Sequence, residues 1–267
     1  MDYSIRDVSE ILNLSREMIR YYEKHGVISP RRNDENNYRS YNIFDIFMLL
    51  DTLQYRSWGI QINGMQDLRQ EDFLQKSRQQ LHLYREQLKE EVLYKQLLLE
   101  RIDTITDRSQ TAHLNFGNHW VKTLPAYCFV PLVQGDADHY GAIEIPQEAS
   151  RILFTDRVAP FWNFCFEEVG NHQLWGICLP QQFFQALHLP EIEGMRLRPQ
   201  QTCLCSILDL GPIGKFDSNY AQPALAYLHQ KGYEQGGTMT AILLGRGFEQ
   251  RQFVRPVELY IPLRLKP

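Results

Sequence analysis

The stretch SREMIRYYEKHG, residues 15–26, decides the fold of the N-terminal part of this 267-residue chain. Its cations recur at four-residue spacing, which places them on one face of a helix; they are Arg16, Arg20 and Lys24. The apolar residues between them would face a core. Ser15 is a favoured residue just before a helix, and Gly26 is a favoured residue just past its end. The stretch therefore predicts a short helix with one cationic face.

The neighbouring residues predict a helix on either side of this one. Ser4 and Asp7 have the spacing of a capping box, and apolar residues follow them at helical spacing, so a helix is expected to end near Asn13. Asn42 and Asp45 repeat that capping pattern before a third helix. A shorter helix is expected around three apolar residues, Ile62, Met65 and Leu68. Between the second and third helices, the polar run 33–37 predicts a hairpin turn.

A helix-turn-helix with a cationic second helix indicates DNA binding. The first turns of such a helix enter the major groove, where arginine contacts guanine and cations contact phosphates. A tyrosine hydroxyl can position the protein on a phosphate, and Tyr38 and Arg39 on the hairpin arm can add a second contact. The predicted DNA-contacting residues are Arg16, Arg20, Tyr21, Lys24, Tyr38 and Arg39. The alternative is a solvated helix face, because residues 16–39 hold six cations against four acids, a net charge of only +2.

A long helix is expected after this domain, because residues 71–107 contain neither glycine nor proline. Apolar residues recur there at multiples of seven, which is typical of a coiled coil. We therefore predict an antiparallel coiled-coil dimerisation helix over residues 71–112. Its predicted dimer contacts are Leu81, Tyr84, Leu88, Leu98 and Ile102. The alternative is a long helix packed on its own C-terminal domain.

Residues 113–267 change to short apolar runs separated by glycine and proline, which predicts an α+β domain. Gly170 and Asn171 indicate a hairpin between two of the strands, and residues 219–233 predict a helix. The five cysteines all follow residue 127 without paired spacing, so we expect reduced thiols and no metal site or cofactor. The net charge of −4 argues against a wholly basic protein that coats nucleic acid. The lack of a long apolar run and of an apolar signal core near residue 1 indicates a cytoplasmic chain with no membrane partner.

Residues 3 to about 68 resemble the DNA-binding domain of the MerR family of transcription regulators. The stretch IRYYEKHGVISP, residues 19–30, and the hairpin NNYRSY, residues 36–41, carry this resemblance together with the helix after them. The resemblance implies a winged helix-turn-helix domain over residues 1–70, in which Arg20 and Tyr21 contact the DNA backbone and Tyr38 and Arg39 serve the wing. Glu17 departs from the family pattern, where this position is often basic, so the preferred DNA sequence is left open.

Residues 202–265 resemble the GyrI-like effector-binding domain of multidrug-sensing members of that family. The segments 208–237 and 255–265 carry the resemblance, whereas residues 119–200 depart from it. It implies an aromatic cleft with a buried acid that faces lipophilic cations, and Glu258 is the candidate acid. A buried carboxylate needs a cationic partner, and aromatic faces attract cations. The predicted ligand contacts are Glu258, Tyr260, Trp162, Phe164, Trp175 and Tyr227; the alternative for each aromatic is a place in the core.

Together these features predict a homodimeric transcription regulator and not an enzyme. By resemblance it senses a small lipophilic organic ligand, remodels double-stranded promoter DNA and affects RNA polymerase only through that DNA. A metal sensor of this family is disfavoured because no cysteine precedes Cys128. Two further alternatives stay open. One is a ligand-degrading hydrolase with Glu258 as its base, and the other is an architectural repressor without a ligand.

Overall fold

The computed structural model describes residues 2–33, 37–58, 73–170, 172–249 and 251–265. The chain forms two compact units, Met1–Leu93 and Tyr94–Pro267. The helix expected around Ile62, Met65 and Leu68 lies outside the described residues. So do residues 34–36 of the expected hairpin turn.

The first unit contains the three expected helices, α1 (Ile5–Leu12), α2 (Arg16–Lys24) and α3 (Ile43–Ser57). The capping box of Ser4 and Asp7 forms before α1, and the side chain of Ser15 accepts the backbone N–H of Met18 at the start of α2. Asn42 and Asp45 form the same kind of box before α3. Each cap satisfies N–H groups that a helix start leaves without partners. The helical boundaries predicted from these residues are confirmed.

A two-stranded hairpin follows α2 in the first unit. Strand β1 (Arg31–Arg32) pairs antiparallel with β2 (Arg39–Ser40). Asn37, near the turn, has a φ of 57°, a left-handed conformation that asparagine tolerates well. The hairpin is anchored by backbone hydrogen bonds between Tyr3 and Tyr41, at 2.8 and 2.9 Å. The helices and the hairpin share a core centred on Val8, Ile19, Tyr22, Tyr41 and Leu49.

The long helix is also confirmed: α5 spans Phe73–Leu114 without interruption for 42 residues. In the second unit, part of α5 packs on its own domain. Tyr94, Leu97 and Leu98 pack against a cluster that contains Phe161 and Phe183. Leu98 is half-buried and packs on the domain that follows it. The contact of Leu98 with a dimer partner stays a prediction. The alternative of a helix packed on its own domain holds for this part of α5.

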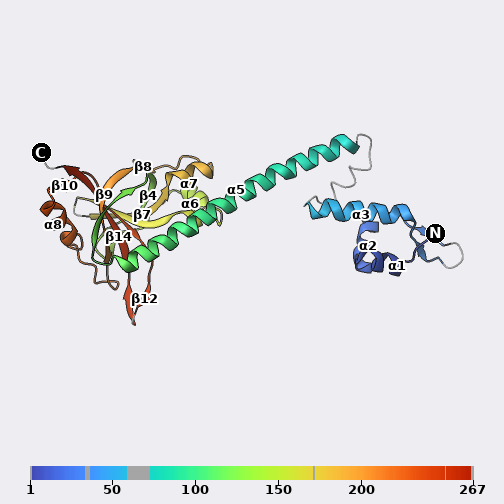
Figure 1. Ribbon diagram of the computed structural model, residues 1–267, viewed down its shortest axis with the longest axis horizontal. Helices are drawn as coiled ribbons and strands as arrows, with labels where there is room; N and C mark the ends of the chain where they lie inside the picture. Colours follow the sequence, from blue (N-terminus) through green and yellow to red (C-terminus); the bar gives the residue numbers. More distant parts are fainter. Residues whose placement is uncertain (1, 34–36, 59–72, 171, 250, 266–267) are drawn as a thin grey trace. The chain divides into compact units, whose positions relative to one another are not determined.

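The second unit is built on an antiparallel sheet. Within the described residues the strand order is β3-β9-β14-β11-β6-β7-β4-β5, with β10 paired to β14 and β8 to β4. These strands are β3 (His119–Leu124), β4 (Tyr127–Asp136), β5 (His139–Tyr140), β6 (Asn163–Val169), β7 (His172–Pro180), β8 (Arg196–Arg198), β9 (Gln201–Asp209), β10 (Tyr233–Gln235), β11 (Thr240–Leu243) and β14 (Pro256–Leu265). A separate hairpin, β12 (Gly247–Glu249) with β13 (Gln252–Val254), projects from the sheet (Figure 1).

Short helices accompany the sheet (Figure 1). They are α6 (Gln147–Leu153), the 3-10 turn η1 (Ala159–Phe161), α7 (Gln181–Ala186) and α8 (Gln222–Gln230). Alternate residues of β14 divide the sheet into two faces. Leu259 packs in a cluster with Leu228 of α8, whereas Tyr260 packs in another cluster with Cys205 and Phe129. Glu258 is two residues before Tyr260 and therefore lies on the same face of the sheet as Tyr260. Arg108, in the second half of α5, contacts Glu258 on that face.

Candidate functional site

The cationic face of α2 is exposed, as its four-residue spacing predicts. Arg16, Arg20 and Lys24 are exposed on one side, while Ile19 and Tyr22 are fully buried on the other. Tyr21 lies between these faces and is 43% exposed. One short helix can hold both cations and tyrosines because the cations lie on its exposed face and Tyr22 lies on its buried face. The tyrosine at position 22 belongs to the core, and its hydroxyl accepts a hydrogen bond from Arg56 at 2.6 Å.

The hairpin presents further cations beside an exposed tyrosine. Arg31 and Arg32 of β1 are exposed, and Tyr38 is 74% exposed. Arg39 behaves differently, because its Nε donates to both carboxylate oxygens of Glu23 on α2, at 2.8 and 3.0 Å. This hydrogen bonding raises the pKa of Arg39 and ties the hairpin to the second helix. In this structure Arg39 therefore positions the wing, and Arg31 and Arg32 are the exposed arginines there.

The second half of α5 brings two buried arginines to the sheet. Arg101 is 4% exposed and donates to the carbonyl oxygens of Pro160 and Trp162 and, at 2.7 Å, to Oδ1 of Asn163. Arg108, two helical turns later, donates to the same Asn163 oxygen at 3.1 Å. Burial, together with the charge of Arg108, lowers the pKa of Arg101 to about 10. Among the described residues, no carboxylate forms an ion pair with Arg101.

Glu258 is 1% exposed and has two cationic partners within the chain. Nε of Arg108 donates to one carboxylate oxygen and Nζ of Lys122 to the other, each at 2.9 Å. Burial alone raises the pKa of Glu258, but the two cations outweigh burial and hold that pKa below its ordinary value. The partner that we expected from a ligand cation is thus supplied by the protein. The physical reason for placing an organic cation against Glu258 no longer applies.

A cavity of about 1000 Å³ lies between the C-terminal half of α5 and the ends of several strands. Figure 1 shows the end of α5 beside the hairpin β12–β13, and both contribute to the cavity wall. Two predicted ligand contacts, Trp162 and Phe164, line this cavity, together with Arg101, Arg108 and Arg246. Its two acids, Asp209 and Glu249, are exposed.

The other predicted ligand contacts lie elsewhere. Trp175 is 3% exposed in the core on the α8 side of the sheet, where it stacks on Phe166 with ring centroids 4.5 Å apart. Tyr260 is 3% exposed in the cluster on the opposite face. Tyr227 of α8 stacks on His119. For these three aromatics, a structural place accounts for the side chain, and the structure brings only Trp162 and Phe164 together at the cavity.

Arg246 forms the remaining cationic part of the cavity wall. Its guanidinium lies over the ring of Phe164, 4.5 Å from the centroid. Burial lowers the pKa of Arg246. None of the described carboxylates is paired with it, so its hydrogen-bonding edge is available to a ligand.

Sequence reasoning missed all three cavity arginines. Leu98, Arg101 and Arg108 recur at spacings of three and seven, so a signal existed in the form of two arginines on the same helix face as the half-buried Leu98. The spacing alone does not identify these arginines as cavity residues, because it does not show which face of α5 meets the sheet. Arg246 had no local signal, because it follows a strand in an irregular segment.

The described residues contain neither a group of His, Cys, Asp and Glu that could hold a metal ion nor a helix that could cross a membrane.

Residues 4–41 match the family model described as MerR family regulatory protein. A curated relative, heavy metal-dependent transcription regulator 2 of Rhizobium meliloti (strain 1021), is 34% identical over 65 residues. That match covers 24% of this chain, and the chain spans 44% of the relative's length. The N-terminal segment that forms α1, α2 and the hairpin is therefore a MerR-family domain.

Solved structures give weaker likenesses. A MerR-family transcriptional regulator from Bacillus cereus is 22% identical, with 41% of this chain and 84% of that chain covered and a TM-score of 0.35. A cryo-EM structure of an EcmrR–DNA complex in EcmrR-RPo is 16% identical, with 98% of this chain and all of that chain covered, again at a TM-score of 0.35. TM-scores this low do not establish a shared arrangement.

Proposed function

From the MerR-family domain at its N-terminus, we propose that this chain is a DNA-binding transcription regulator that works as a homodimer and senses a small organic ligand. The observation that carries the proposal is the exposed cationic surface of α2 and the hairpin. Arg16, Arg20 and Lys24 project from the helix that enters the major groove in helix-turn-helix proteins. Arg31 and Arg32 extend that surface onto the hairpin.

Tyr21 and Tyr38 fit the same surface. Both are exposed, and a phenol hydroxyl can contact a phosphate oxygen without reading the base sequence. Arg39 supports this surface through its ion pair with Glu23, which holds the hairpin against α2. DNA contacts of Tyr38 would then be set by a hairpin that is fixed to the recognition helix.

The exposed apolar side of α5 supports a homodimer. Leu88 is 40% exposed, Val92 55%, Leu99 63% and Ile102 56%. These residues recur at spacings of three, four and seven, so they form one stripe along the helix. Leu81 and Tyr84 continue the stripe toward the N-terminal end. An exposed stripe of this kind is buried most simply by the same stripe of a second copy in an antiparallel coiled coil.

The cavity supports ligand sensing by the second unit. It has the size of a small-molecule site, and Trp162 and Phe164 give it aromatic walls. Because Arg101 and Arg108 belong to α5, a ligand in the cavity contacts the helix that carries the proposed dimer stripe. The resemblance to GyrI-like effector domains gives the same function to this half of the chain.

A regulator of this kind acts on RNA polymerase through the shape of promoter DNA. Bending or untwisting a binding site costs about 1–6 kcal/mol. Differential binding of an effector to two protein states supplies about 1–3 kcal/mol, which is enough to shift such an equilibrium. We propose this energetic coupling, and not a direct contact with polymerase, as the means of control.

A ligand-degrading enzyme is the alternative for the second unit. Glu258 is a poor general base in this structure, because both of its oxygens are bound by cations that lower its pKa. A time course of the ligand concentration with purified protein distinguishes the two functions. A constant concentration supports sensing, and steady consumption supports the enzyme.

The homodimer is tested by sedimentation of the full chain. A double variant, Leu88→Lys with Ile102→Lys, places two charges on the stripe and is expected to sediment as a monomer. Leu83→Lys is the matched control, because Leu83 is 51% exposed but lies off the stripe. A wild-type monomer, or a double variant that stays dimeric, would contradict the proposed contact.

A further inference from the structure

The environment of Glu258 contains more buried positive charge than negative charge. Arg108 and Lys122 share this one carboxylate, and Arg101 shares the acceptor Asn163 with Arg108. Arg101 itself has only neutral acceptors. A buried charge without an opposite charge is costly, so an uncompensated cation at this depth points to a missing anion.

Arg108 also retains unused hydrogen-bonding capacity. Its Nε binds Glu258 and its Nη1 binds Asn163, but its buried Nη2 has no hydrogen-bond partner among the described residues. A buried donor without an acceptor costs free energy comparable to a lost hydrogen bond. A small movement of the guanidinium toward an acidic ligand in the adjoining cavity would satisfy it.

A third arginine lines the same cavity. Arg246 has Phe164 under one face of its guanidinium and no carboxylate partner. The acids of the cavity wall do not balance these cations. Oδ1 of Asp209 already accepts the backbone N–H groups of Gly211 and Arg255, and Glu249 is exposed on the hairpin β12–β13.

The remaining wall is suited to an apolar or aromatic ligand body. Trp162, Phe164 and Phe116 contribute aromatic surface, and Ile105 and Leu244 contribute aliphatic surface. Arginine binds a carboxylate through two parallel hydrogen bonds, and aromatic walls orient a flat ring beside that contact.

We propose that the cavity between α5 and the sheet binds an organic anion, namely a carboxylate carried on an aromatic or apolar body, through Arg246, Arg108 and Arg101. This inference rests on the proposed function, since it names the class of ligand that the second unit senses. The ligand carboxylate lies at the arginines, and its body lies against Trp162 and Phe164. Glu258 holds Arg108 in place from behind and does not contact the ligand.

Three probes that share a naphthalene ring and differ in charge test the inference on the full chain. They are 2-naphthoate, the neutral 2-naphthamide and the cationic (2-naphthylmethyl)trimethylammonium, each titrated by calorimetry. The expected result is that naphthoate binds roughly tenfold or more tightly than either other probe, because only it forms charge-assisted hydrogen bonds with arginine. Equal or tighter binding of the cation, or no binding by any of the three, would overturn the inference.

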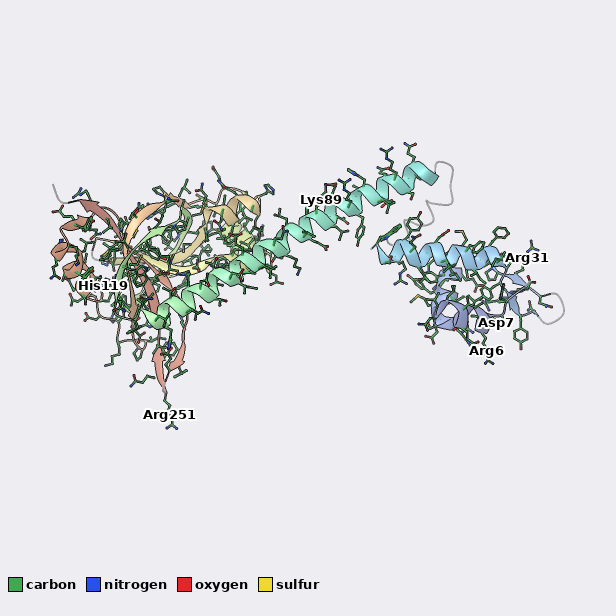
Figure 2. The ribbon with its side chains drawn as sticks, viewed as in Figure 1. Arg6, Asp7, Arg31, Lys89, His119 and Arg251 are labelled. Carbon is green, nitrogen blue, oxygen red and sulfur yellow. The ribbon has the colours of Figure 1, made fainter. Side chains whose placement is uncertain are left out.

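Two variants locate the site. Arg246→Gln is expected to weaken naphthoate binding roughly tenfold and to leave naphthamide nearly unchanged, because it removes one charge-assisted contact. Arg251→Gln is the matched control, because Arg251 lies at the tip of the same hairpin region and extends away from the sheet (Figure 2). A naphthoate affinity that Arg246→Gln leaves intact would remove this cavity as the site.

Glu258→Gln separates an anion site from a cation site. Loss of this carboxylate increases the excess of positive charge, so naphthoate affinity is expected to stay the same or rise. A cation bound to Glu258 would instead lose affinity. Circular dichroism first establishes that the variant is folded, and if it is not, the Arg246→Gln result decides alone because that side chain is not buried in the core.

The same preparation distinguishes this inference from the proposed function. Duplex DNA binding is measured without any probe. DNA binding with a preference for the cationic probe overturns the anion site only, whereas naphthoate binding without DNA binding overturns the regulator and leaves the anion site standing.

Discussion

The two units of the chain use arginine in opposite surroundings. On α2 and β1, Arg16, Arg20, Arg31 and Arg32 are exposed to solvent. On α5, Arg101 and Arg108 are largely buried and bind acceptors of their own domain. A hydrated arginine can exchange water and counterions for the phosphates of a large polyanion, whereas a buried arginine must be neutralised within the fold or by a small ligand that enters it.

This difference shows that the number of arginines in a unit does not indicate what kind of molecule the unit binds. Arg255 is 4% exposed and has a full counter-charge, because both carboxylate oxygens of Asp138 accept hydrogen bonds from its Nη1 and Nη2. Three backbone carbonyl oxygens accept further hydrogen bonds from its Nε and Nη2. Arg101, equally buried, has no acid. Two arginines can therefore be equally buried and differ in role. An arginine with a carboxylate partner inside the fold is structural, whereas one without such a partner is a candidate ligand contact.

The largest effect is expected when the satisfied buried pair is broken. Asp138→Asn leaves the guanidinium of Arg255 buried without its counter-charge, so the free energy of unfolding should fall by about 3–5 kcal/mol. Denaturant titration measures this change. The exposed pair of Arg6 and Glu10 is the control, and Glu10→Gln should cost less than about 1 kcal/mol. Equal effects at the two sites would contradict the comparison.

The same pair predicts a pH dependence. Hydrogen bonds from Arg255 and from the backbone N–H groups of Phe216 and Gly214 outweigh burial and lower the pKa of Asp138 far below its ordinary value of 3.8. A carboxylate whose pKa is lower in the folded state stabilises the fold above its unfolded pKa and loses that contribution as the pH falls. The stability difference between wild type and Asp138→Asn should therefore be full at pH 7 and shrink below about pH 4. A difference that is constant from pH 7 to pH 2 would exclude this cause.

A smaller loss is expected at Glu258. Glu258→Gln removes the counter-charge of Arg108 and Lys122, but Lys122 is partly exposed and can recover hydration, so the free energy of unfolding should fall by about 2–3 kcal/mol. A second substitution, Lys122→Gln, tests this account. If the carboxylate and Lys122 interact, the double variant should lose less stability than the sum of the two single variants.

Removal of an exposed arginine should affect binding and not stability. Arg20→Ala is expected to change the free energy of unfolding by no more than about 0.5 kcal/mol. Its DNA affinity should fall, and the slope of log K against log salt should decrease by about one unit. Glu10→Gln on α1 again serves as the control. An unchanged slope would remove Arg20 from the phosphate contacts.

The smallest effect is expected at the ion pair that joins the hairpin to α2. Arg39 and Glu23 are partly exposed, so Glu23→Gln should cost less than about 1 kcal/mol of stability. Nuclear magnetic resonance of the hairpin amides should nevertheless report a change in β1 and β2, because the variant loses one tie to the helix. An unchanged hairpin spectrum would mean that the ion pair does not position the wing.

Local features of the fold were predictable from the sequence, because their causes lie within a few residues. Ser4 with Asp7 and Asn42 with Asp45 mark helix starts by a side-chain cap three residues wide. The run without glycine or proline marks α5, and Gly170 marks the β6–β7 turn with a φ of 66°. The exposed face of α2 follows in the same way from four-residue spacing.

The cavity was not predictable, because its contacts join distant parts of the chain. Arg108 lines the cavity, and its partner Glu258 is 150 residues away in the sequence. The ion pair of Arg255 and Asp138, outside the cavity, likewise joins residues 117 apart. The sequence shows a carboxylate on a buried strand but not which cation meets it. Helical spacing likewise reveals that the face of Leu98 is apolar, but not that the following domain covers part of this side chain.

DNA binding through the exposed arginines is the central claim, and its salt dependence tests it most directly. Duplexes are first selected from a random library with the full chain, and affinity is then measured across salt concentrations for wild type and for the triple variant Arg16→Ala, Arg20→Ala and Lys24→Ala. We expect tight, salt-dependent binding by wild type and a slope lower by about three units in the triple variant. Failure to select any duplex, or equal slopes for the two proteins, would contradict the account.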